Sequence, residues 1–445
     1  MGIDIAKQYH EITKHSPITL YSSSHYLDWE NKPSPFKFYL NLDQIGLPSI
    51  FDFPSDNAIK CLTDDNNNFI NQKIDTKILS QILFFSAGIT RKVKLQGSTY
   101  YMRAASATGA LYPIEIYVVC KKIGNIDAGV YHFCPGSFML TKLRGGDFLK
   151  ELFLATGNNK NVTQAPVVLI FTSIAWRNSW KYQARSYRHW FWDCGVIIAN
   201  YLALCNSNLF TTEIVLGFQD EVINKLLCLE DKKEAAIVLA PLAIDLANNN
   251  EDIGSPESIS SLRYELKPIS KYQENYYSEI WDIHEASYLK DQSEISKWVN
   301  TMTNDTIIHR LHNKQERRIP SQIDETEDNL GNVILQRGST RKFARKAITL
   351  LQLYNILYLA TINIPFDFQK KHTLIDIYLI ANSVVNLKSG SYYYNRISGK
   401  LETLNLGNYR HISEHLCLDQ KLFGDASVVF FSNGKLRTGF TKARK

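Results

Sequence analysis

Apolar residues recur at helical spacing in two parts of the chain. Between positions 78 and 85 they lie three and four residues apart, and Gly88 follows as a residue that readily ends a helix. Between positions 187 and 205 the same spacing continues over a longer stretch with a wide apolar face. The pattern therefore predicts a helix that ends near Gly88 and a long helix that is central to its unit.

Short apolar runs rich in β-branched residues predict the strands. Two compact runs lie at 114–120 and 167–172. Two further runs, at 213–217 and 235–239, predict additional strands, with a helix between them near 221–228. Helices and strands thus occur together, which indicates an α+β fold.

The pattern repeats itself once along the chain. The segment from Glu115 to Val119 matches the segment from Asp376 to Ile380 at an offset of 261 (376 − 115), and the register holds without a gap as far as 165–168. Such a repeat predicts two related units in tandem. Measured from the preceding helix the offset is 273, so the second copy lacks about a dozen residues before its first strand. It also lacks a counterpart of the long helix.

Composition divides the chain into four parts. We expect an irregular N-terminal arm over 1–70 and a first complete unit over 71–247. Asn, Ser, Glu and Lys dominate 248–329, which predicts a polar linker with one amphipathic stretch around 276–288. The second unit, 330–445, is degenerate and truncated. Without its central helix it cannot close its own core, so either the first unit covers it or the chain is a truncated product.

Charge and cysteine content restrict the class of protein. A net charge of +6 over 445 residues demands neither nucleic acid nor an anionic membrane as partner. The seven cysteines are scattered without a CxxC pair, which is typical of buried thiols in a reducing compartment and favours the cytoplasm. No signal peptide is visible, and no run reaches the ~18 apolar residues of a membrane span. The histidines show no metal-ligand spacing, so we expect no metal.

The first candidate for chemistry is the small-residue segment between the first helix and the strand at 114–120. It begins at Arg103, offers hydroxyls at Ser106 and Thr108, and can turn tightly at Gly109. Such a loop can hold a phosphate or the edge of a flat cofactor ring. An ordinary turn before a strand remains the alternative.

The second candidate lies at the start of the long helix. Lys181 and Tyr182 are adjacent, and Arg185 and Arg188 share one helix face just after them. An adjacent Lys and Tyr can supply a proton donor and an acceptor. The alternative is a solvated helix start whose arginines pair with nearby carboxylates such as Asp193.

The third candidate opens the second unit. Arg337 and Arg341 stand four residues apart, with Ser339 between them. Two guanidinium groups with a hydroxyl between them suit a phosphate. A basic turn ahead of a helix is the alternative.

Together these segments resemble the SagB-type dehydrogenases, the thiazole/oxazole-forming (McbC-like) branch of the FMN-dependent nitroreductase superfamily. The likeness covers 5–245 and, more weakly, 330–435. It rests on the opening at 9–16, the loop at 103–115, the segment at 181–195, the loop at 217–227 and the motif at 337–341. Ala107 departs from it, because the family has a flavin-contacting serine at that place.

The resemblance implies a nitroreductase-like mixed β-sheet flanked by helices, with FMN bound where two such units meet. Arg103, Ser106, Thr108 and Gly109 would contact the flavin from one unit, and the 337–341 motif would hold its phosphate from the other. Lys181 and Tyr182 would be the catalytic pair of azoline oxidation. The two units that enclose FMN could belong to one chain or to the two chains of a homodimer.

Three functions follow from this resemblance. The first is an FMN-dependent oxidoreductase that oxidises thiazoline or oxazoline rings in a ribosomal peptide, with a modified precursor peptide and a cyclodehydratase complex as partners. The second is a general NAD(P)H-dependent reductase of nitro or quinone compounds. The third is a flavin-free scaffold of a peptide-modifying complex. The intact Lys181–Tyr182 pair favours the first over the second.

Overall fold

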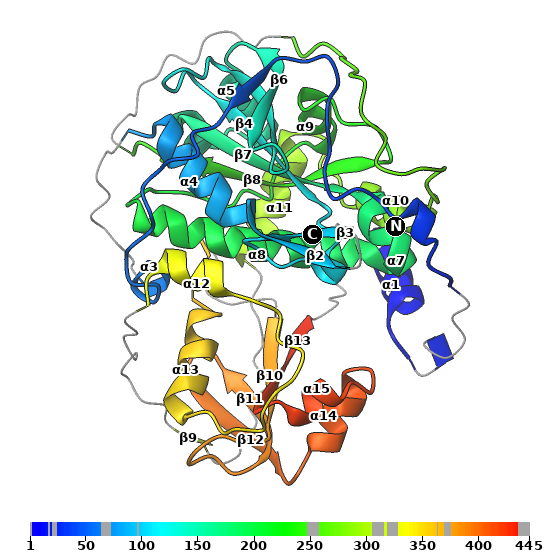
Figure 1. The fold of residues 1–445 in the computed structure, drawn as a ribbon, viewed down its shortest axis with the longest axis vertical. Coiled ribbons are helices and arrows are strands. Elements are labelled where there is room, and N and C mark those ends of the chain that lie inside the picture. Colours follow the sequence, from blue (N-terminus) through cyan, green and yellow to red (C-terminus); the bar gives the residue numbers. More distant parts are fainter. Residues whose placement is uncertain are drawn as a thin grey trace.

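The computed structural model describes residues 2–16, 18–19, 25–63, 73–95, 98–246, 258–304, 316–317, 328–362, 364–368 and 375–434. These residues form a larger unit around a six-stranded sheet and a smaller unit around a five-stranded sheet. The larger unit lies above the smaller one in Figure 1. The expected α+β class, with sheets flanked by helices, is confirmed.

The larger sheet consists of antiparallel neighbours. Their order is β1 (Gln44–Gly46), β6 (Met139–Gly145), β5 (Gly129–Cys134), β4 (Ile114–Cys120), β7 (Val167–Ile174) and β8 (Glu234–Leu242). Every residue of β4, β5, β7 and β8 is buried. In the described residues, parallel pairing occurs as isolated bridges, one of which joins Ile214 to Phe366 of the smaller unit.

Helices cover both faces of the larger sheet. On one face α4 (Thr76–Ala87) and α8 (Ser186–Ser207) pack against β4 and β7 in the main hydrophobic core. On the other face α5 (Leu149–Ala155), α6 (Lys160–Gln164) and α9 (Asp220–Leu226) close a second core. The predicted helix that ends near Gly88 is α4, and the predicted long helix is α8.

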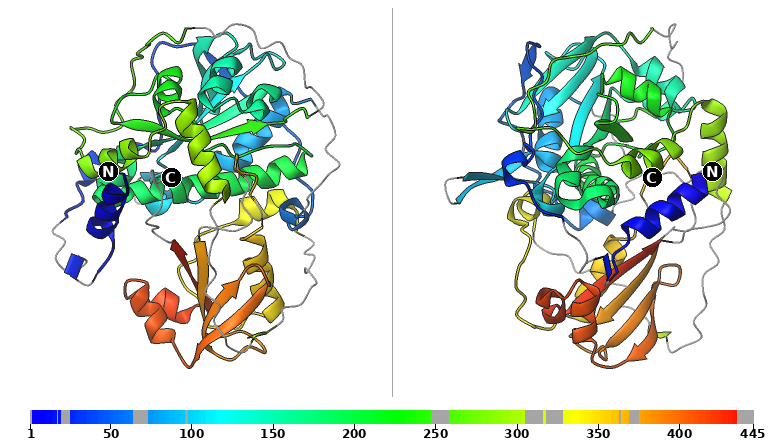
Figure 2. Two further views of the ribbon diagram at one scale, coloured as in Figure 1. Left: turned by 180° about the vertical axis from the view of Figure 1, so that it is seen from behind. Right: turned by 90° about the vertical axis from the view of Figure 1, so that its right-hand side faces the viewer.

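Three further segments connect or flank these layers. A hairpin of β2 (Ile89–Leu95) and β3 (Ser98–Arg103) leaves the end of α4 and returns to the sheet. Helix α7 (Ala175–Tyr182) and the 3-10 turn η3 (Gln183–Arg185) lead from β7 into α8. Helix α1 (Gly2–Thr13) packs beside α8 and next to α10 (Ser278–Ala286). Helices α1, α7 and α10 lie near the start of α8 in Figure 1, and Figure 2 gives two further views of the fold.

The smaller sheet repeats the larger one in register. Its order is β13 (Val428–Gly434), β10 (Ile375–Ala381), β11 (Gly390–Asn395), β12 (Lys400–Leu406) and β9 (Glu316–Arg317). The partners Ile116 and Phe133 become Ile377 and Tyr394, an offset of 261 for both. The bulge between Val130 and Tyr131 recurs between Ser391 and Tyr392 at the same offset. The tandem repeat is therefore confirmed at the level of single hydrogen-bonded pairs.

Within the described residues, the second unit shows fewer covering helices than the first. Helices α13 (Leu350–Leu359), α14 (Arg410–Leu416) and α15 (Lys421–Asp425) correspond to α4, α5 and α6. No counterpart of α8 lies in the described residues, and the chain after 434 lies outside them. Leu169 of β7 is 1% exposed beneath the first unit's helices, whereas its counterpart Phe430 is 39% exposed. The second sheet is thus partly open on the face that α8 covers in the first unit.

The segment 213–217 is not a strand, so that prediction is wrong. Val215 exchanges hydrogen bonds with Leu239, at 2.8 and 3.1 Å, but Ile214 bonds to Pro365 and Asp367 of the smaller unit. Because its two sides pair with different partners, the segment forms isolated bridges and no continuous ladder. It is one of the joints between the units.

Two helices come from the polar region of the sequence, and one of them, α11 (Gln292–Asn304), is a further joint between the units. Helix α10 sends Ile280 and Trp281 into the main core. Helix α11 forms a small separate cluster in which Trp298 meets Phe368 of the smaller unit. Helix α12 (Leu330–Gln336) then packs on the main core before the chain enters the second repeat. Three shorter elements complete the fold, η1 (Trp29–Asn31), α3 (Lys60–Thr63) and η2 (Thr108–Ala110).

Candidate functional site

The small-residue loop runs from the end of β3 to the start of β4 in a strained conformation. Gly109 has φ +64°, and two non-glycine residues, Ala110 and Tyr112, have φ of +54° and +51°. Each non-glycine residue in this region costs on the order of 1–3 kcal/mol, and such strain tends to gather at functional sites. Ser106 is half-buried and lines a small cavity beside Arg103 and Asp193.

Arg103 lies beneath the loop and is 4% exposed. Its Nη2 donates to the carbonyl of Pro35 at 2.5 Å, and its guanidinium lies 4.6 Å from the ring of Tyr112. Its Nε is buried and makes no hydrogen bond within the described residues. Burial lowers the pKa of Arg103 to about 10, against the opposing charge of Glu115. Arg103 therefore ties the start of the loop to Pro35 and Tyr112 through buried contacts.

The Lys181–Tyr182 pair closes the loop from the other side. A Cβ built on Gly109 would lie 2.8 Å from the Tyr182 hydroxyl, so glycine permits this close approach. Lys181 is exposed, and its Nζ lies 5.3 Å from the Tyr182 ring. Gln183, with φ +49° and ψ −143°, ends α7 directly after Tyr182. Burial, and then the charge of Asp193, raise the pKa of Tyr182, so its hydroxyl is protonated at neutral pH.

Asp193 of α8 joins the loop to α7. Its Oδ1 accepts hydrogen bonds from the Thr108 backbone N–H at 2.8 Å and from the Thr108 hydroxyl at 2.7 Å. Its Oδ2 accepts from Asn178 of α7 at 3.3 Å. Thr108 is thereby committed to Asp193 through both of its donors. The carboxylate fixes the relative position of the two segments that carry the candidate residues.

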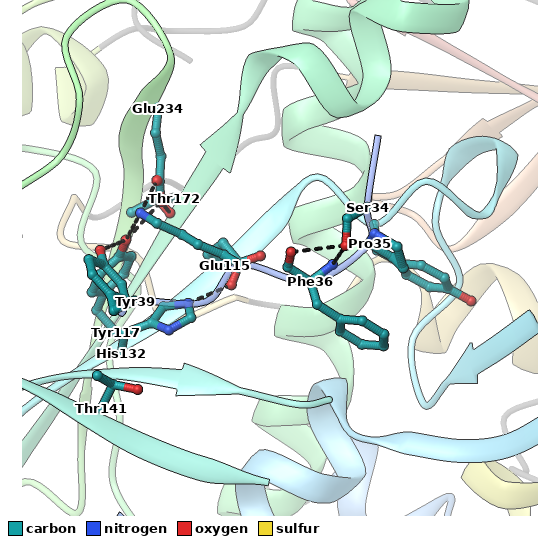
Figure 3. Close-up of polar contacts among 12 residues, drawn as sticks. Ser34, Pro35, Phe36, Tyr39, Glu115, Tyr117, His132, Thr141, Thr172 and Glu234 are labelled. Atoms are coloured by element: carbon teal, nitrogen blue, oxygen red, sulfur yellow. Dashed lines mark hydrogen bonds and ion pairs between the residues drawn. The ribbon is translucent and has the colours of Figure 1, made fainter. Parts of the chain in front are cut away.

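A buried ionic network anchors α7 to the sheet. Glu115 of β4 pairs with Arg177 of α7 and lies 2.6 Å from His132 of β5. Arg177 also donates to the carbonyls of Ser34 and Tyr112, both at 2.9 Å. Burial alone would raise the pKa of Glu115, but the charge of Arg177 and the hydrogen bond from His132 outweigh it and lower the pKa to about 2. Glu115, His132 and Ser34 are labelled in Figure 3.

A second buried network lies next to the first on the same face of β4, since Tyr117 is two residues from Glu115 and its ring lies 5.1 Å from that of His132. Glu234 accepts from Thr172 at 2.5 Å and from Tyr117 at 3.0 Å, as Figure 3 shows. Its other oxygen accepts from Lys37 at 2.6 Å. Burial alone would lower the pKa of Lys37, but the Glu234 carboxylate outweighs it and raises the pKa. The network holds the N-terminal arm against the sheet.

Lys37 and Glu234 also line a cavity of about 620 Å³ that is bounded by 230–234 and 264–281. Trp176 and Ser179 of α7 face this cavity. At 100° per residue, Trp176 lies on the opposite side of α7 from Asn178 and Tyr182. None of the residues predicted to bind cofactor or to catalyse lines it.

The second unit contributes to the loop through Arg337, which directly follows α12. Its Nε donates to the carbonyl of Ala104 and its Nη2 to the carbonyl of Arg103, both at 3.3 Å. Ser339 and Arg341 are exposed. The structure thus brings together the loop, the Lys181–Tyr182 pair and the start of the 337–341 motif.

The alternative to a catalytic role was a solvated helix start in which Arg185 and Arg188 pair with carboxylates such as Asp193. Neither arginine pairs with Asp193. Arg185 donates to the carbonyl of Thr13 in α1. Arg188 donates to the Thr13 hydroxyl from Nη2 at 2.9 Å and from Nε at 3.2 Å. Both arginines therefore face α1 and point away from the loop.

The sequence did not reveal two supporting contacts. These are the hydrogen bonds from Thr108 to Asp193 and the ion pair between Arg177 and Glu115. Glu115 and Arg177 are 62 residues apart, and Thr108 and Asp193 are 85 apart. No local spacing could have linked them. A charged residue inside an otherwise apolar strand, as Glu115 is, was the available signal.

Three further findings concern the chemistry of the described part of the chain. It contains no group of three or more His, Cys, Asp or Glu residues that could hold a metal ion. None of its helices is long and apolar enough to cross a membrane. The seven cysteines form no disulfide bond, and five of them are buried.

Two comparisons with known proteins match the larger unit. The model of the nitroreductase family matches residues 67–242. A candidate nitroreductase of Methanocaldococcus jannaschii is 26% identical over 174 residues, which are 39% of this chain and 83% of that protein. The match falls on the unit that contains the loop, α7 and α8.

One solved structure extends the likeness to nearly the whole chain. The crystal structure of a candidate nitroreductase from Anabaena variabilis has a TM-score of 0.68 and 25% identity, and covers 97% of this chain and 85% of that one. A chain of the E. coli microcin synthetase complex, solved with truncated pro-MccB17 bound, has a TM-score of 0.36 and 18% identity, with coverage of 55% and 93%. The model of the nitroreductase family thus matches the larger unit, and the chain has the nitroreductase fold.

Proposed function

We propose that the chain is an FMN-dependent oxidoreductase with one FMN site, formed between its two units. The observation that carries the proposal is the contact of Arg337 with the carbonyls of Arg103 and Ala104. It brings the arginine motif of one repeat against the small-residue loop of the other. The family match of residues 67–242 supports the flavin.

The residues at this junction fit FMN. Arg341 is exposed, and Arg337 uses Nε and Nη2 on carbonyls, so its Nη1 faces no acceptor within the described residues. Guanidinium groups bind phosphate through two parallel hydrogen bonds, and we assign Arg337 and Arg341 to the phosphate, with Ser339 beside them. On the ring side, the glycine at 109 and the small residues before it allow close approach of the backbone.

Two of the loop's hydroxyls take different roles in this proposal. Ser106 makes no hydrogen bond that ties it to a neighbour in the described part and lines the small cavity, so its hydroxyl suits a polar edge of the ring. Thr108 donates both of its protons to Asp193, which leaves its hydroxyl oxygen as an acceptor only. Arg103 acts from beneath, as a buried positive charge behind the loop.

We assign the reaction to oxidation of an azoline ring in a peptide. The ring loses a hydride from one carbon and a proton from its neighbour, and so becomes an aromatic thiazole or oxazole. When bound, FMN supplies the hydride acceptor, and an external electron acceptor must later reoxidise it. The Lys181–Tyr182 pair takes the proton.

The geometry suggests separate roles for the pair. The Tyr182 hydroxyl is protonated at neutral pH and lies against Gly109, so it can donate a hydrogen bond to the substrate or relay its proton. Lys181 lies beside the Tyr182 ring and is exposed, so in its neutral amine form it can accept the proton that Tyr182 relays and pass it to solvent. We propose a modified precursor peptide as the substrate and a cyclodehydratase complex as the partner that forms the azoline.

The proposal is tested first by the flavin and then by turnover. Heat should release FMN from the purified chain, as identified by chromatography; FAD, or no flavin after reconstitution with excess FMN, would contradict it. Lys181→Ala and Tyr182→Phe should keep FMN and lose on the order of a hundred- to ten-thousand-fold in azoline oxidation. Steady NADPH oxidation with a nitroaromatic, without azoline oxidation, would instead favour the general reductase.

A further inference from the structure

The junction of α1 and α8 gathers basic side chains beside the proposed catalytic pair. Two arginines and three histidines from these helices and their ends form what we call the α1–α8 cationic cluster: Arg185, Arg188, His189, His10 and His15. None of them has a role in the proposed FMN site or in proton transfer.

Neutral groups and aromatic rings hold both arginines in place. Arg188 bonds to the Thr13 hydroxyl and lies 5.6 Å from the ring of Tyr9, and its Nη2 is 3.3 Å from His10 Nδ1. Arg185 bonds to the Thr13 carbonyl and lies 6.0 Å from the ring of Trp192. The side chains are thus fixed by contacts that leave their charge unneutralised.

Burial, and then the neighbouring guanidinium groups, lower the pKa values of the other basic groups in the cluster. Burial, and then the neighbouring Arg188, lower the pKa of Arg185. Burial, and then Arg185, lower the pKa of His189 to about 4, so its imidazole is neutral at pH 7. Glu11, the carboxylate that acts on His10, is itself paired with Lys14. The two guanidinium groups therefore remain charged next to one another.

His189 is the member of the cluster that contacts Tyr182. The His189 ring packs edge-on against the Tyr182 ring at 4.4 Å and lies 5.1 Å from Trp192. Trp192 is 51% exposed although it is large and apolar. The Nδ1 of His189 is buried and makes no hydrogen bond within the described residues. An exposed tryptophan flanked by arginine is typical of a surface that binds another chain.

We propose that the α1–α8 cationic cluster binds a carboxylate-bearing segment of the peptide substrate and so selects peptides with an acidic residue near the ring to be oxidised. The inference rests on the proposed function, because the anionic groups that a peptide carries are carboxylates. Guanidinium forks match the planar carboxylate, and Trp192 offers a face for the neighbouring backbone or side chain. An extended peptide advances about 3.3 Å per residue, so the acidic residue would lie within a few residues of the azoline.

Peptide binding without turnover tests this proposal. Fluorophore-labelled, acetylated and amidated tetraglutamate and tetraglutamine peptides are titrated against the full chain reconstituted with FMN, at low salt, by fluorescence anisotropy. We expect tetraglutamate to bind about tenfold more tightly, and the difference to shrink as salt is added. Arg185→Gln and Arg188→Gln should each reduce that preference several-fold. Arg185→Lys, which keeps the charge but loses the guanidinium fork, should retain only part of it.

Arg263→Gln is the matched control. Arg263 is exposed and lies beside Tyr264, which bonds to the carbonyl of Leu143 on β6, whereas Arg185 and Arg188 are half-buried. Thermal unfolding checks that each variant is folded, and Arg185→Gln alone suffices if Arg188→Gln is unstable. Equal binding of the two peptides by the native chain, or an unchanged preference in folded Arg185→Gln, would overturn the inference. Because the titration needs no turnover, it stays informative if azoline oxidation itself is not found.

Discussion

Around Tyr182, single residues hold the backbone in conformations that few side chains tolerate. Gly109, Ala110, Tyr112 and Gln183 all have positive φ, and Gly109 lies in contact range of the Tyr182 hydroxyl. Strain of this kind persists where the surrounding contacts over-determine the backbone. Here the bonds of Asp193 to Thr108 and Asn178 supply such contacts.

The first prediction at this scale concerns Gly109→Ala. The new Cβ would lie 2.8 Å from the Tyr182 hydroxyl at a φ of +64°, so either the loop or Tyr182 must shift. We expect a loss of about 1 kcal/mol in stability and a fall in azoline oxidation of at least about tenfold. Gly46→Ala, where a Cβ would meet nothing within 4 Å, is the control. Full activity in Gly109→Ala would show that the approach of Tyr182 to the loop is not needed.

The second prediction follows from the lowered pKa of Glu115. Its ordinary value is 4.5 and its value in the folded chain is about 2, so the unfolded state binds more protons between these pH values. The stabilisation is fully present above pH 4.5 and is lost as the pH falls through 2. Glu115→Gln should remove this part of the acid sensitivity. At pH 7 it should cost roughly 3–5 kcal/mol, because Arg177 is left buried and unpaired.

Urea unfolding at a series of pH values measures both effects. Parallel stability curves for the native chain and Glu115→Gln would contradict the assignment. The Lys181–Tyr182 pair could be proposed from residue types alone, since the two residues are adjacent. The Glu115–Arg177–His132 network could not, because its members come from two strands and a helix that only the fold brings together.

Among the elements, those with one long apolar pattern were predicted well. The helices at 78–85 and 187–205, and the strands at 114–120 and 167–172, appear as α4, α8, β4 and β7. Burial on one whole face determines such patterns. The segment 213–217 has the same composition as a strand, but its hydrogen bonds are divided between β8 and the second unit. A local pattern carries no information about such a division.

Asp193 gives the prediction at the scale of elements. It joins the loop to α7 from its position on α8, so Asp193→Ala should release both segments and leave Asn178 and Thr108 without their acceptor. We expect weaker FMN binding and at least about a tenfold loss in azoline oxidation. Asp193→Asn keeps one acceptor oxygen and should have a smaller effect.

A double-mutant cycle separates this positioning role from general destabilisation. Thr108→Val should add little to Asp193→Ala, because the side-chain hydrogen bond that it removes is already lost. Independent, additive effects on FMN affinity would contradict a shared role. Unfolding temperatures of the same variants show how much of the loss is structural.

For the whole molecule, the repeat explains both the likeness and the asymmetry of the two units. We propose that 71–247 is the FMN domain, that 1–70 and 248–329 are its arm and linker, and that 330–445 is the incomplete second unit. The register of 261 could be read from the sequence because strand residues at matching positions are similar. The contacts made by α10 and α11 could not, because the apolar residues there are few and lie within a polar stretch.

The central claim is that FMN binds once per chain, between the loop of the first unit and the arginine motif of the second. The most direct measurement is the amount of FMN bound per chain in the native protein and in Arg337→Ala and Arg341→Ala, with Arg263→Ala as the control. We predict one FMN per chain in the native protein and the control, and an affinity at least about tenfold weaker in each of the other two. Unchanged FMN affinity in both arginine variants would contradict the claim.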